Sequence, residues 1–91
     1  MQYKIIIEPT AQEDLQNIFA YIKANDSINQ AKNFLKKLQT AINSLSFMPK
    51  RCRDSLYIKD GKTKDLIYQG YTICYHIKEN CVHIVAIFRQ R

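Results

Sequence analysis

The stretch KDLIYQGYTICYHIKENCVHIVAIFRQR, residues 64–91, decides the fold. Apolar and polar residues alternate along it with a period of two, and turn residues interrupt the pattern at Gly70 and at Glu79-Asn80, which predicts three antiparallel strands. With Glu79 and Asn80 as the second turn, the face expected to join the core carries Ile73, Tyr75, Ile77, Val82, Ile84 and Ala86. The opposite face, expected to remain free for function, carries Thr72, Cys74, His76, Lys78, Cys81, His83, Val85, Ile87 and Arg89. A shift of one residue in the register would exchange the two faces.

A strand and a helix are expected before this sheet. Residues 2–8 form an apolar run that Pro9 ends, which suits a strand covered on both sides or paired at the sheet edge. Residues 10–13 (TAQE) match a capping box, in which the Thr10 hydroxyl accepts a backbone N–H three residues further on. Apolar residues then recur at helical spacing, so we expect a helix from about Ala11 to Ala24.

A second helix follows a short break at Asn25-Asp26. Ser27 and Gln30 form another capping signal, and an apolar stripe continues from there for about five turns. Two helices joined by so short a link fold back as an antiparallel hairpin, whose apolar side would cover the sheet with Phe34 and Leu38 at its centre. The sequence therefore predicts an α+β fold: an N-terminal strand, then an antiparallel two-helix hairpin packed on one face of a three- to four-stranded antiparallel sheet.

The connection between the helices and the sheet is basic. Phe47-Met48-Pro49 ends the second helix, and Lys50-Arg51-Cys52-Arg53 follows as an irregular segment. Residues 55–59 (SLYIK) can form a further strand before a turn at Asp60-Gly61-Lys62. The basic run is either a binding surface or an ordinary solvated loop.

Length and composition indicate one domain, residues 1–91. With 46% hydrophobic and 24% charged residues, the chain can build one small core. No apolar run reaches the roughly 20 residues of a membrane-spanning helix, and the first residues lead into a strand rather than a signal peptide, so we expect a cytoplasmic protein. Cys52, Cys74 and Cys81 are odd in number and fit no zinc-finger spacing, so we expect reduced thiols.

The net charge of +6 is unevenly distributed. Residues 1–45 carry five Lys against four acidic residues, a balance of +1, whereas residues 46–91 carry nine Lys and Arg against four acidic residues, a balance of +5. Positive charge gathered in one half of a chain favours an acidic partner, either nucleic acid or an acidic protein segment.

A series of motifs runs along essentially the whole chain. Its members are Pro9-Thr10-Ala11, Asp14-Leu15 and Ile18 through Tyr21-Ile22; Ala31, Phe34, Leu38, Ala41-Ile42 and Leu45 through Phe47-Met48-Pro49; Gly70-Tyr71, Ile73 and Tyr75; and Val82 to Arg91. In this order and spacing the series resembles the RelE/ParE superfamily of toxins from bacterial type II toxin–antitoxin modules. The long helical hairpin with Leu-x-x-x-Pro at its end is more similar to the ParE branch, whose members poison DNA gyrase, than to the RelE branch, whose members cut mRNA in the ribosomal A site.

The sequence departs from the superfamily pattern in three places. Arg89 stands where a His commonly precedes a basic pair, and Gln90 and Arg91 follow it. Lys64 stands where an Arg is usual before the central strand. The tyrosine that RelE-type nucleases carry a few residues beyond their strand arginine has no counterpart within the 91 residues. The choice between gyrase and the ribosome therefore stays open.

Cleavage of RNA by its 2′-hydroxyl requires a proton acceptor, cations beside the phosphate and a donor for the leaving oxygen. His76 and His83 are the acceptors nearest in pKa, but six residues along a strand separate His83 from Arg89 by roughly 20 Å. A metal-independent endoribonuclease would therefore use a lysine as the base, and its candidate catalytic residues are Lys50, Arg53, Lys64 and Arg89.

The pairs Cys74/His76 and Cys81/His83 invite a metal site. The two cysteines would stand more than about 10 Å apart along the strands, too far to share one ion, so we expect no metal and no cofactor.

The expected target-binding surface combines the cations with one tyrosine. Tyr71 and Tyr75 share the core face, which leaves Tyr68 for a surface contact. The full set is Lys50, Arg51, Arg53, Lys64, Tyr68, Arg89 and Arg91.

The resemblance implies a growth-inhibiting toxin that a cognate antitoxin neutralises, with an amphipathic antitoxin segment along the helical hairpin and its acidic residues on the basic half. The freed toxin would bind DNA gyrase. One alternative is a ribosome-dependent mRNA endonuclease that uses the same cations, and another is a basic nucleic-acid-binding module without toxicity.

Overall fold

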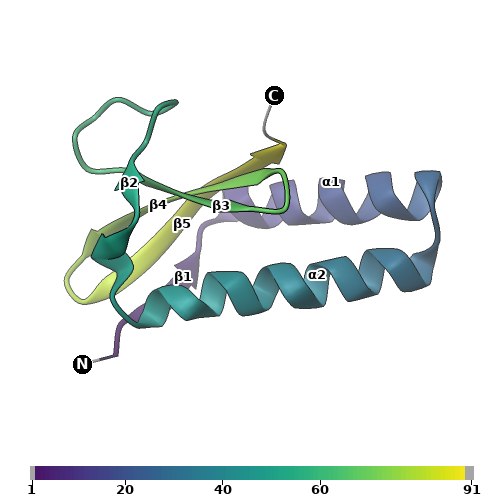
Figure 1. Ribbon diagram of the computed structural model, residues 1–91, viewed down its shortest axis with the longest axis horizontal. Coiled ribbons are helices and arrows are strands. Elements are labelled where there is room, and N and C mark those ends of the chain that lie inside the picture. The colour runs from purple at the N-terminus through teal and green to yellow at the C-terminus, as the bar shows by residue number, and fades with distance from the viewer. Residues whose placement is uncertain (1, 90–91) are drawn as a thin grey trace.

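The computed structural model describes residues 2–89 and places two helices against one face of a five-stranded sheet (Figure 1). The elements are β1 (Lys4–Ile7), α1 (Pro9–Asn25), α2 (Ile28–Asn43), 3₁₀ helices at Ser44–Ser46 and Pro49–Arg51, β2 (Arg53–Asp54), β3 (Lys64–Tyr68), β4 (Tyr71–Lys78) and β5 (Cys81–Arg89). The strand order is β1-β5-β4-β3-β2, in which β1 runs parallel to β5 and every other pair is antiparallel. The predicted α+β fold is confirmed, but the expectation of three to four antiparallel strands is wrong, because β1 joins the sheet in parallel to β5 and the short β2 adds a fifth strand.

The helical hairpin forms as predicted, except at its first cap. The Ser27 hydroxyl accepts from the backbone N–H of Gln30 at 3.1 Å and caps α2. The capping box at Thr10 is wrong, because α1 already begins at Pro9 and the Thr10 hydroxyl donates to the carbonyl of Val85 at 2.8 Å. The Val85 carbonyl lies just beyond Ile84, the last residue of β5 that pairs with β1, and it competes successfully for this hydroxyl. Within residues 2–89, no helix combines the length and the apolarity that crossing a membrane requires.

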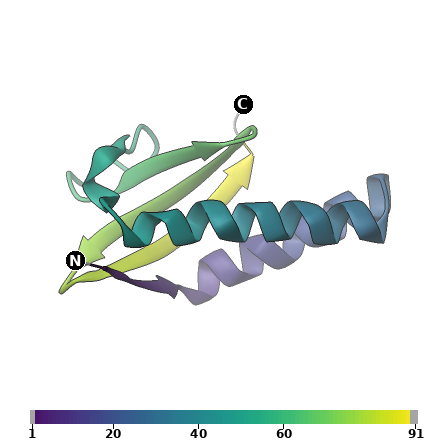
Figure 2. The same cartoon turned by 60° about the horizontal axis from the view of Figure 1, so that its bottom comes forward.

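The core lies between the hairpin and the sheet (Figure 2). Leu38 is fully buried at its centre, as expected. Phe34 lies instead at the rim, where its ring packs 5.2 Å from Tyr71 and 6.4 Å from Tyr68 between centroids. The residues of the sheet that are buried against the hairpin are Ile73, Tyr75, Val82, Ile84 and Ile87. We call this side of the sheet the helix face and the other side the loop face.

A β-bulge changes which residues of β5 reach the helix face. The predicted pairs of Tyr75 with Ile84 and of Ile77 with Val82 are confirmed. Beyond them the register shifts, and Ile73 pairs with Ile87 rather than with Ala86. The predictions that Ala86 lies on the core face and that Ile87 and Arg89 lie on the opposite face are therefore wrong. One extra residue in β5 reverses the alternation of side chains after it. The backbone N–H of Ile87 donates to the Asp14 carboxylate at 2.9 Å, so α1 holds the shifted segment in place.

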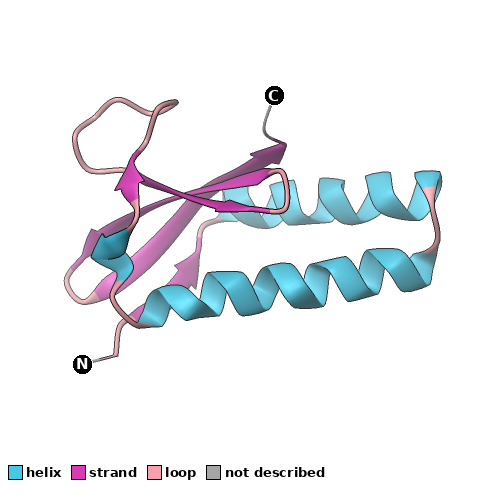
Figure 3. Ribbon diagram, in the orientation of Figure 1, coloured by secondary structure: helices cyan, strands magenta, loops and turns pink. Residues whose placement is uncertain are grey.

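The strand predicted at residues 55–59 is also wrong. Residues 55–63 form a loop between β2 and β3, which appears pink at the upper left of Figure 3. The backbone N–H of Ser55 donates to the carbonyl of Thr63 at 2.8 Å and closes the base of this loop. Side-chain hydrogen bonds within the loop compete with strand pairing, because Ser and Asp offer the backbone alternative partners.

Candidate functional site

The basic segment lies where the chain leaves α2 and enters the sheet. Met48 adopts a left-handed backbone conformation there, with φ of 50°, and Pro49 behind it is buried. The hydroxyl of Tyr75, which is buried in β4, donates to the carbonyl of Pro49. Burial raises the pKa of Tyr75, so the hydroxyl keeps its proton and this hydrogen bond. The core thus anchors the start of the basic segment.

Arg51 turns back toward the helix end. Its guanidinium donates to the carbonyls of Phe47 and Met48 at 3.0 and 3.2 Å and to the Ser44 hydroxyl at 3.1 Å. Carbonyls at a helix end lack partners within the helix, and a cation there is stabilised by them. Arg51 therefore closes the end of the helical hairpin.

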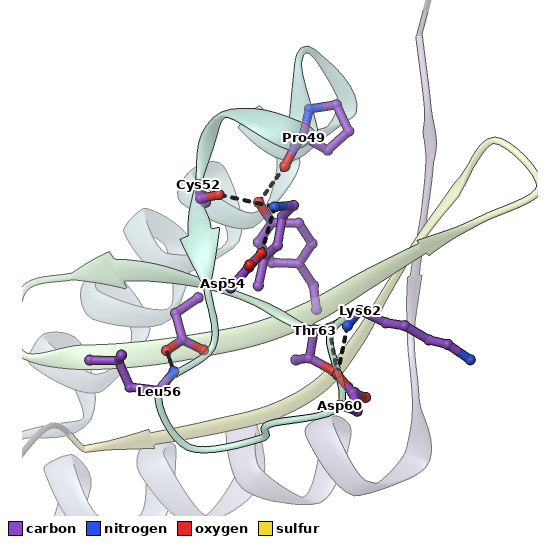
Figure 4. A network of polar contacts seen from close by, with 10 residues as sticks. Pro49, Cys52, Asp54, Leu56, Asp60, Lys62 and Thr63 are labelled. Carbon is purple, nitrogen blue, oxygen red and sulfur yellow. Dashed lines mark hydrogen bonds and ion pairs between the residues drawn. The ribbon is translucent and has the colours of Figure 1, made fainter.

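Lys64 and Arg53 straddle the edge between β2 and β3. The ammonium of Lys64 donates to the carbonyl of Cys52 at 3.3 Å and to the carboxylate of Asp54 at 3.1 Å (Figure 4). Arg53 lies on the loop face, with its guanidinium 3.8 Å from the buried carboxylate of Asp65. Each of these two cations is held by a carboxylate of the chain itself.

The structure thus brings four of the predicted cations together, and we call Lys50, Arg51, Arg53 and Lys64 the basic edge. Lys50 is exposed and forms no ion pair within residues 2–89. It borders a hollow of about 390 Å³ that is also lined by Tyr3, Met48, Pro49 and Arg51.

Arg89 does not join the basic edge. Its guanidinium donates to the Tyr21 hydroxyl at 3.2 Å and lies 5.6 Å from the centre of the Tyr21 ring, on the helix face. Four residues along the strands and two strands across separate Arg89 from Lys64, which amounts to roughly 16 Å. Tyr68 lies in the same row as Arg89 and is half-buried against Phe34. Arg91 lies outside the described residues.

A second hollow, of about 240 Å³, lies beside Arg89. It separates α1 from the ends of β4 and β5 and is lined by Asp14, Asn17, Ile18, Tyr21, Tyr71, Ile87 and Arg89. Most of these side chains are apolar or aromatic, so the hollow suits an apolar group with Arg89 at its rim.

The comparisons with known proteins agree with this architecture. A sequence model described as the ParE toxin of the type II toxin–antitoxin system parDE matches residues 5–91. The chain belongs to the ParE toxin family. Among solved structures, the chain is similar to one from a chromosomal ParDE toxin–antitoxin system of P. aeruginosa, with a TM-score of 0.86, 12% identity and coverage of 99% of this chain and 98% of that one.

A structure of the RelBE2 toxin–antitoxin complex of Mycobacterium tuberculosis is also similar, with a TM-score of 0.68, 21% identity and coverage of 99% and 93% of the two chains. Both likenesses show a shared fold. No curated protein sequence matches the chain.

The histidines of this ParE-family chain lie on the loop face, away from Lys64. The rings of His76 and His83 stack 5.0 Å apart between centroids, and Nδ1 of His83 lies 2.7 Å from the carboxylate of Glu8. His76 follows Tyr75, the residue paired with Lys64, so their side chains point to opposite faces of the sheet. Neither imidazole can therefore take a proton from a group bound beside Lys64.

Sequence reasoning missed the exposed apolar residues around the basic edge. Phe47 and Met48 are exposed at the end of the hairpin, although the sequence indicated them only as a helix terminus. The sequence did contain a signal for this exposure: two large apolar residues are followed directly by Pro and a run of cations. Leu56, Tyr57 and Ile67 are exposed as well, and the mistaken strand at 55–59 concealed the first two.

Proposed function

We propose that this ParE-family toxin is neutralised by a cognate antitoxin and that the freed toxin stops growth by binding DNA gyrase, without cutting nucleic acid itself. Membership in the ParE family supports the antitoxin partner, and so does the fold shared with a ParDE system and a RelBE2 complex. The net charge of +6 supports an acidic partner surface.

The observation that carries the binding mechanism is the way in which the cations of the basic edge are held. Arg51 is bound by carbonyls, while Lys64 and Arg53 are bound by Asp54 and Asp65. These contacts fix the cations in place, and Lys50 and Arg51, which have no carboxylate partner within residues 2–89, leave the basic edge with an excess of positive charge. Phosphodiester cleavage beside Lys64 additionally needs a proton acceptor on that face of the sheet, and both imidazoles point to the opposite face. The arrangement therefore suits recognition better than catalysis.

Purified chain should be incubated with gyrase and supercoiled plasmid and, separately, with programmed ribosomes. We expect gyrase–DNA cleavage complexes to accumulate while the mRNA stays intact. Lys50→Glu should weaken the effect on gyrase, because it reverses the charge of an exposed cation of the basic edge that makes no ion pair or side-chain hydrogen bond within residues 2–89. Lys37→Glu makes the same charge change on the exposed side of α2 and is the matched control.

Two results would contradict this proposal. Cuts mapped to the ribosomal A site and lost in Lys64→Ala or Arg89→Ala would favour the ribosome-dependent endonuclease. Binding to duplex DNA together with unaffected growth on induced expression would favour a basic nucleic-acid-binding module without toxicity.

A further inference from the structure

The loop of residues 55–63 displays apolar side chains on the loop face. Leu56 and Tyr57 are 59% and 48% exposed, and Ile67 in the adjoining β3 is 39% exposed. The Tyr57 ring packs edge-on against Phe88, 4.8 Å away between centroids. Ile67 and Phe88 flank Thr72 in one row across the sheet. We call Leu56, Tyr57, Ile67 and Phe88 the apolar loop patch.

This loop is internally fixed rather than loose. The Ser55 hydroxyl accepts from the backbone N–H groups of Tyr57 and Ile58 at 3.2 and 3.0 Å. The carboxylate of Asp60 accepts from the backbone of Lys62 and Thr63 at 2.9 and 2.8 Å and from the Thr63 hydroxyl at 2.9 Å (Figure 4). These bonds determine the path of the loop without any contribution from the Leu56 side chain.

Polar groups also seat the loop on the sheet. The buried carboxylate of Asp65 accepts from the backbone N–H of Leu56 at 3.1 Å and from the Cys74 thiol at 3.2 Å. Burial and the neighbouring Asp65 raise the pKa of Cys74 to about 12, so the thiol keeps its proton for this bond. The loop thus buries polar groups beneath it and exposes apolar side chains, the reverse of an ordinary surface loop.

The exposure of apolar side chains above buried polar groups has a consequence for binding. A preorganised backbone needs little further ordering when a partner covers the loop, and buried aromatic anchors contribute strongly to the affinity of protein interfaces. A contiguous apolar patch on a monomer often marks an interaction site.

The surroundings of the patch indicate the chemistry of the partner. A hollow of about 490 Å³ beside the loop is lined by Asp60, Lys62, His76, Ile77 and Lys78. Lys59 and Lys62 form no ion pair within residues 2–89. Two of the four patch residues, Leu56 and Ile67, are aliphatic and cannot stack on bases, and the Tyr57 ring is engaged edge-on by Phe88, so the patch suits an apolar pocket of a protein better than a row of bases.

We propose that the apolar loop patch is the contact surface for the protein target of the toxin, with Leu56 and Tyr57 as anchors in an apolar pocket and acidic target residues opposite Lys59 and Lys62. The inference rests on the proposed function in so far as the partner is that target. It adds a loop-face contact to the basic edge, which Arg53 joins to the base of the loop.

The double variant Leu56→Ser/Tyr57→Ser tests the patch. Ile28→Ser is the matched control, because Ile28 is 45% exposed at the start of α2, away from the loop. Affinities for purified gyrase, a short single-stranded RNA and a short DNA duplex should be measured at one ionic strength, together with growth arrest on induction. Circular dichroism and thermal unfolding show that each variant is folded. We expect the double variant to bind gyrase at least about 30-fold more weakly, to lose growth arrest and to keep its nucleic-acid affinities within about twofold.

A second variant separates the order of the loop from its apolar groups. Asp60→Ala removes the carboxylate that accepts three hydrogen bonds and keeps the apolar loop patch, so we expect about a 5-fold loss of gyrase affinity from the added ordering cost.

Several outcomes would overturn the inference. A folded double variant that arrests growth like the wild type shows that the patch is no target contact, as does an equal loss of arrest in Ile28→Ser. Loss of nucleic-acid affinity with unchanged gyrase affinity reassigns the patch to nucleic acid. If the wild-type chain arrests growth but does not bind gyrase, the gyrase proposal alone is refuted. Loss of growth arrest in the folded double variant would then still support the apolar loop patch as the contact surface for the protein target. A wild-type chain without effect on growth overturns both.

Discussion

The two faces of the sheet are closed by different forces. On the helix face, Ile73, Tyr75 and Ile84 are buried against Leu38 by contacts between apolar groups. On the loop face, Asp65 and Cys74 are buried beneath residues 55–63 by hydrogen bonds. Apolar burial is non-directional and scales with area, whereas a hydrogen bond requires a particular distance and angle. The helix face therefore supplies the apolar burial of the core, whereas the loop face fixes the shape of an exposed loop.

The largest effect is expected on the helix face. Leu38→Ala should lower the free energy of unfolding by about 2–5 kcal/mol, because it removes buried methyl groups and leaves a cavity at the centre of the core. Urea unfolding measures the change. Leu56→Ala on the exposed side of the loop is the control and should stay within about 0.5 kcal/mol of the wild type. Equal losses of unfolding free energy in Leu38→Ala and Leu56→Ala would refute the view that apolar burial on the helix face stabilises the protein more than the exposed side of the loop does.

The loop face should respond more weakly to loss of its central acceptor. Asp65→Ala removes the hydrogen bonds from Leu56 and Cys74 and should cost about 1.5–3 kcal/mol, since both donors remain without this acceptor. Amide resonances of residues 55–63 should shift while those of α2 do not. Asp54→Ala breaks an exposed ion pair with Lys64 and should cost no more than about 1 kcal/mol. An unchanged stability of Asp65→Ala would mean that desolvation of the carboxylate cancels its hydrogen bonds.

Acid should loosen the loop at an unusually low pH. Backbone N–H groups of Thr63 and Lys62 hold the pKa of Asp60 at about 2, below its ordinary value of 3.8. Because the pKa is lowered in the folded state, the contribution of the carboxylate to stability is complete above pH 3.8 and is lost as the pH falls through about 2. An NMR titration should show the Lys62 and Thr63 amides shifting with a midpoint near pH 2. Asp60→Asn should abolish this transition, and a wild-type midpoint near 3.8 would show that the bonds do not form in solution.

The smallest effect is expected at the rim of the helix face. Tyr21→Phe removes the hydroxyl that accepts from Arg89 and keeps the ring beneath the guanidinium. Because this hydrogen bond is exposed, the unfolding free energy should change by less than about 0.5 kcal/mol in thermal denaturation. Tyr21→Ala, which also removes the ring, should cost up to about 1 kcal/mol. A larger loss in Tyr21→Phe would mean that the hydroxyl, rather than the ring, positions Arg89.

Much of the helix face could be predicted because its signals are local and periodic. The Ser27 cap, the helical stripe through Leu38 and the turn at Glu79-Asn80 each depend on a few neighbouring residues. Both turn residues adopt positive φ, 52° and 62°, as a two-residue hairpin with a type I′ turn requires. The pairing register of β4 and β5 near the turn then follows from counting residues outward from Glu79 and Asn80.

Register far from the turn could not be predicted by counting. Thr10 and Asp14 hydrogen-bond the backbone of Val85 and Ile87 at the bulge, and they approach β5 only after α1 has packed on the sheet. Arg89 accordingly lies beside Tyr21 rather than on the loop face. An alternation of period two carries no information about such tertiary contacts.

The charged residues of the candidate site could be predicted from the sequence, but the shape of the site could not. The run from Lys50 to Arg53 stood out by composition, and the structure does gather it with Lys64. Leu56 and Tyr57 were assigned to a strand, because their apolar character suits one equally well. Only the hydrogen bonds of Ser55 and Asp60 reveal that the backbone turns away from the sheet and leaves them exposed.

The pairing of β1 with β5 affects how the protein is made. Residues 4–7 find their partners only among residues 81–84, so this contact has nearly the largest sequence separation the chain allows. Contacts between distant segments form late and slow folding. A ribosome that has synthesised both helices still holds a chain whose sheet cannot close, because β5 has yet to emerge. The five-stranded sheet therefore stays incomplete until the last strand has been synthesised, however early both helices form.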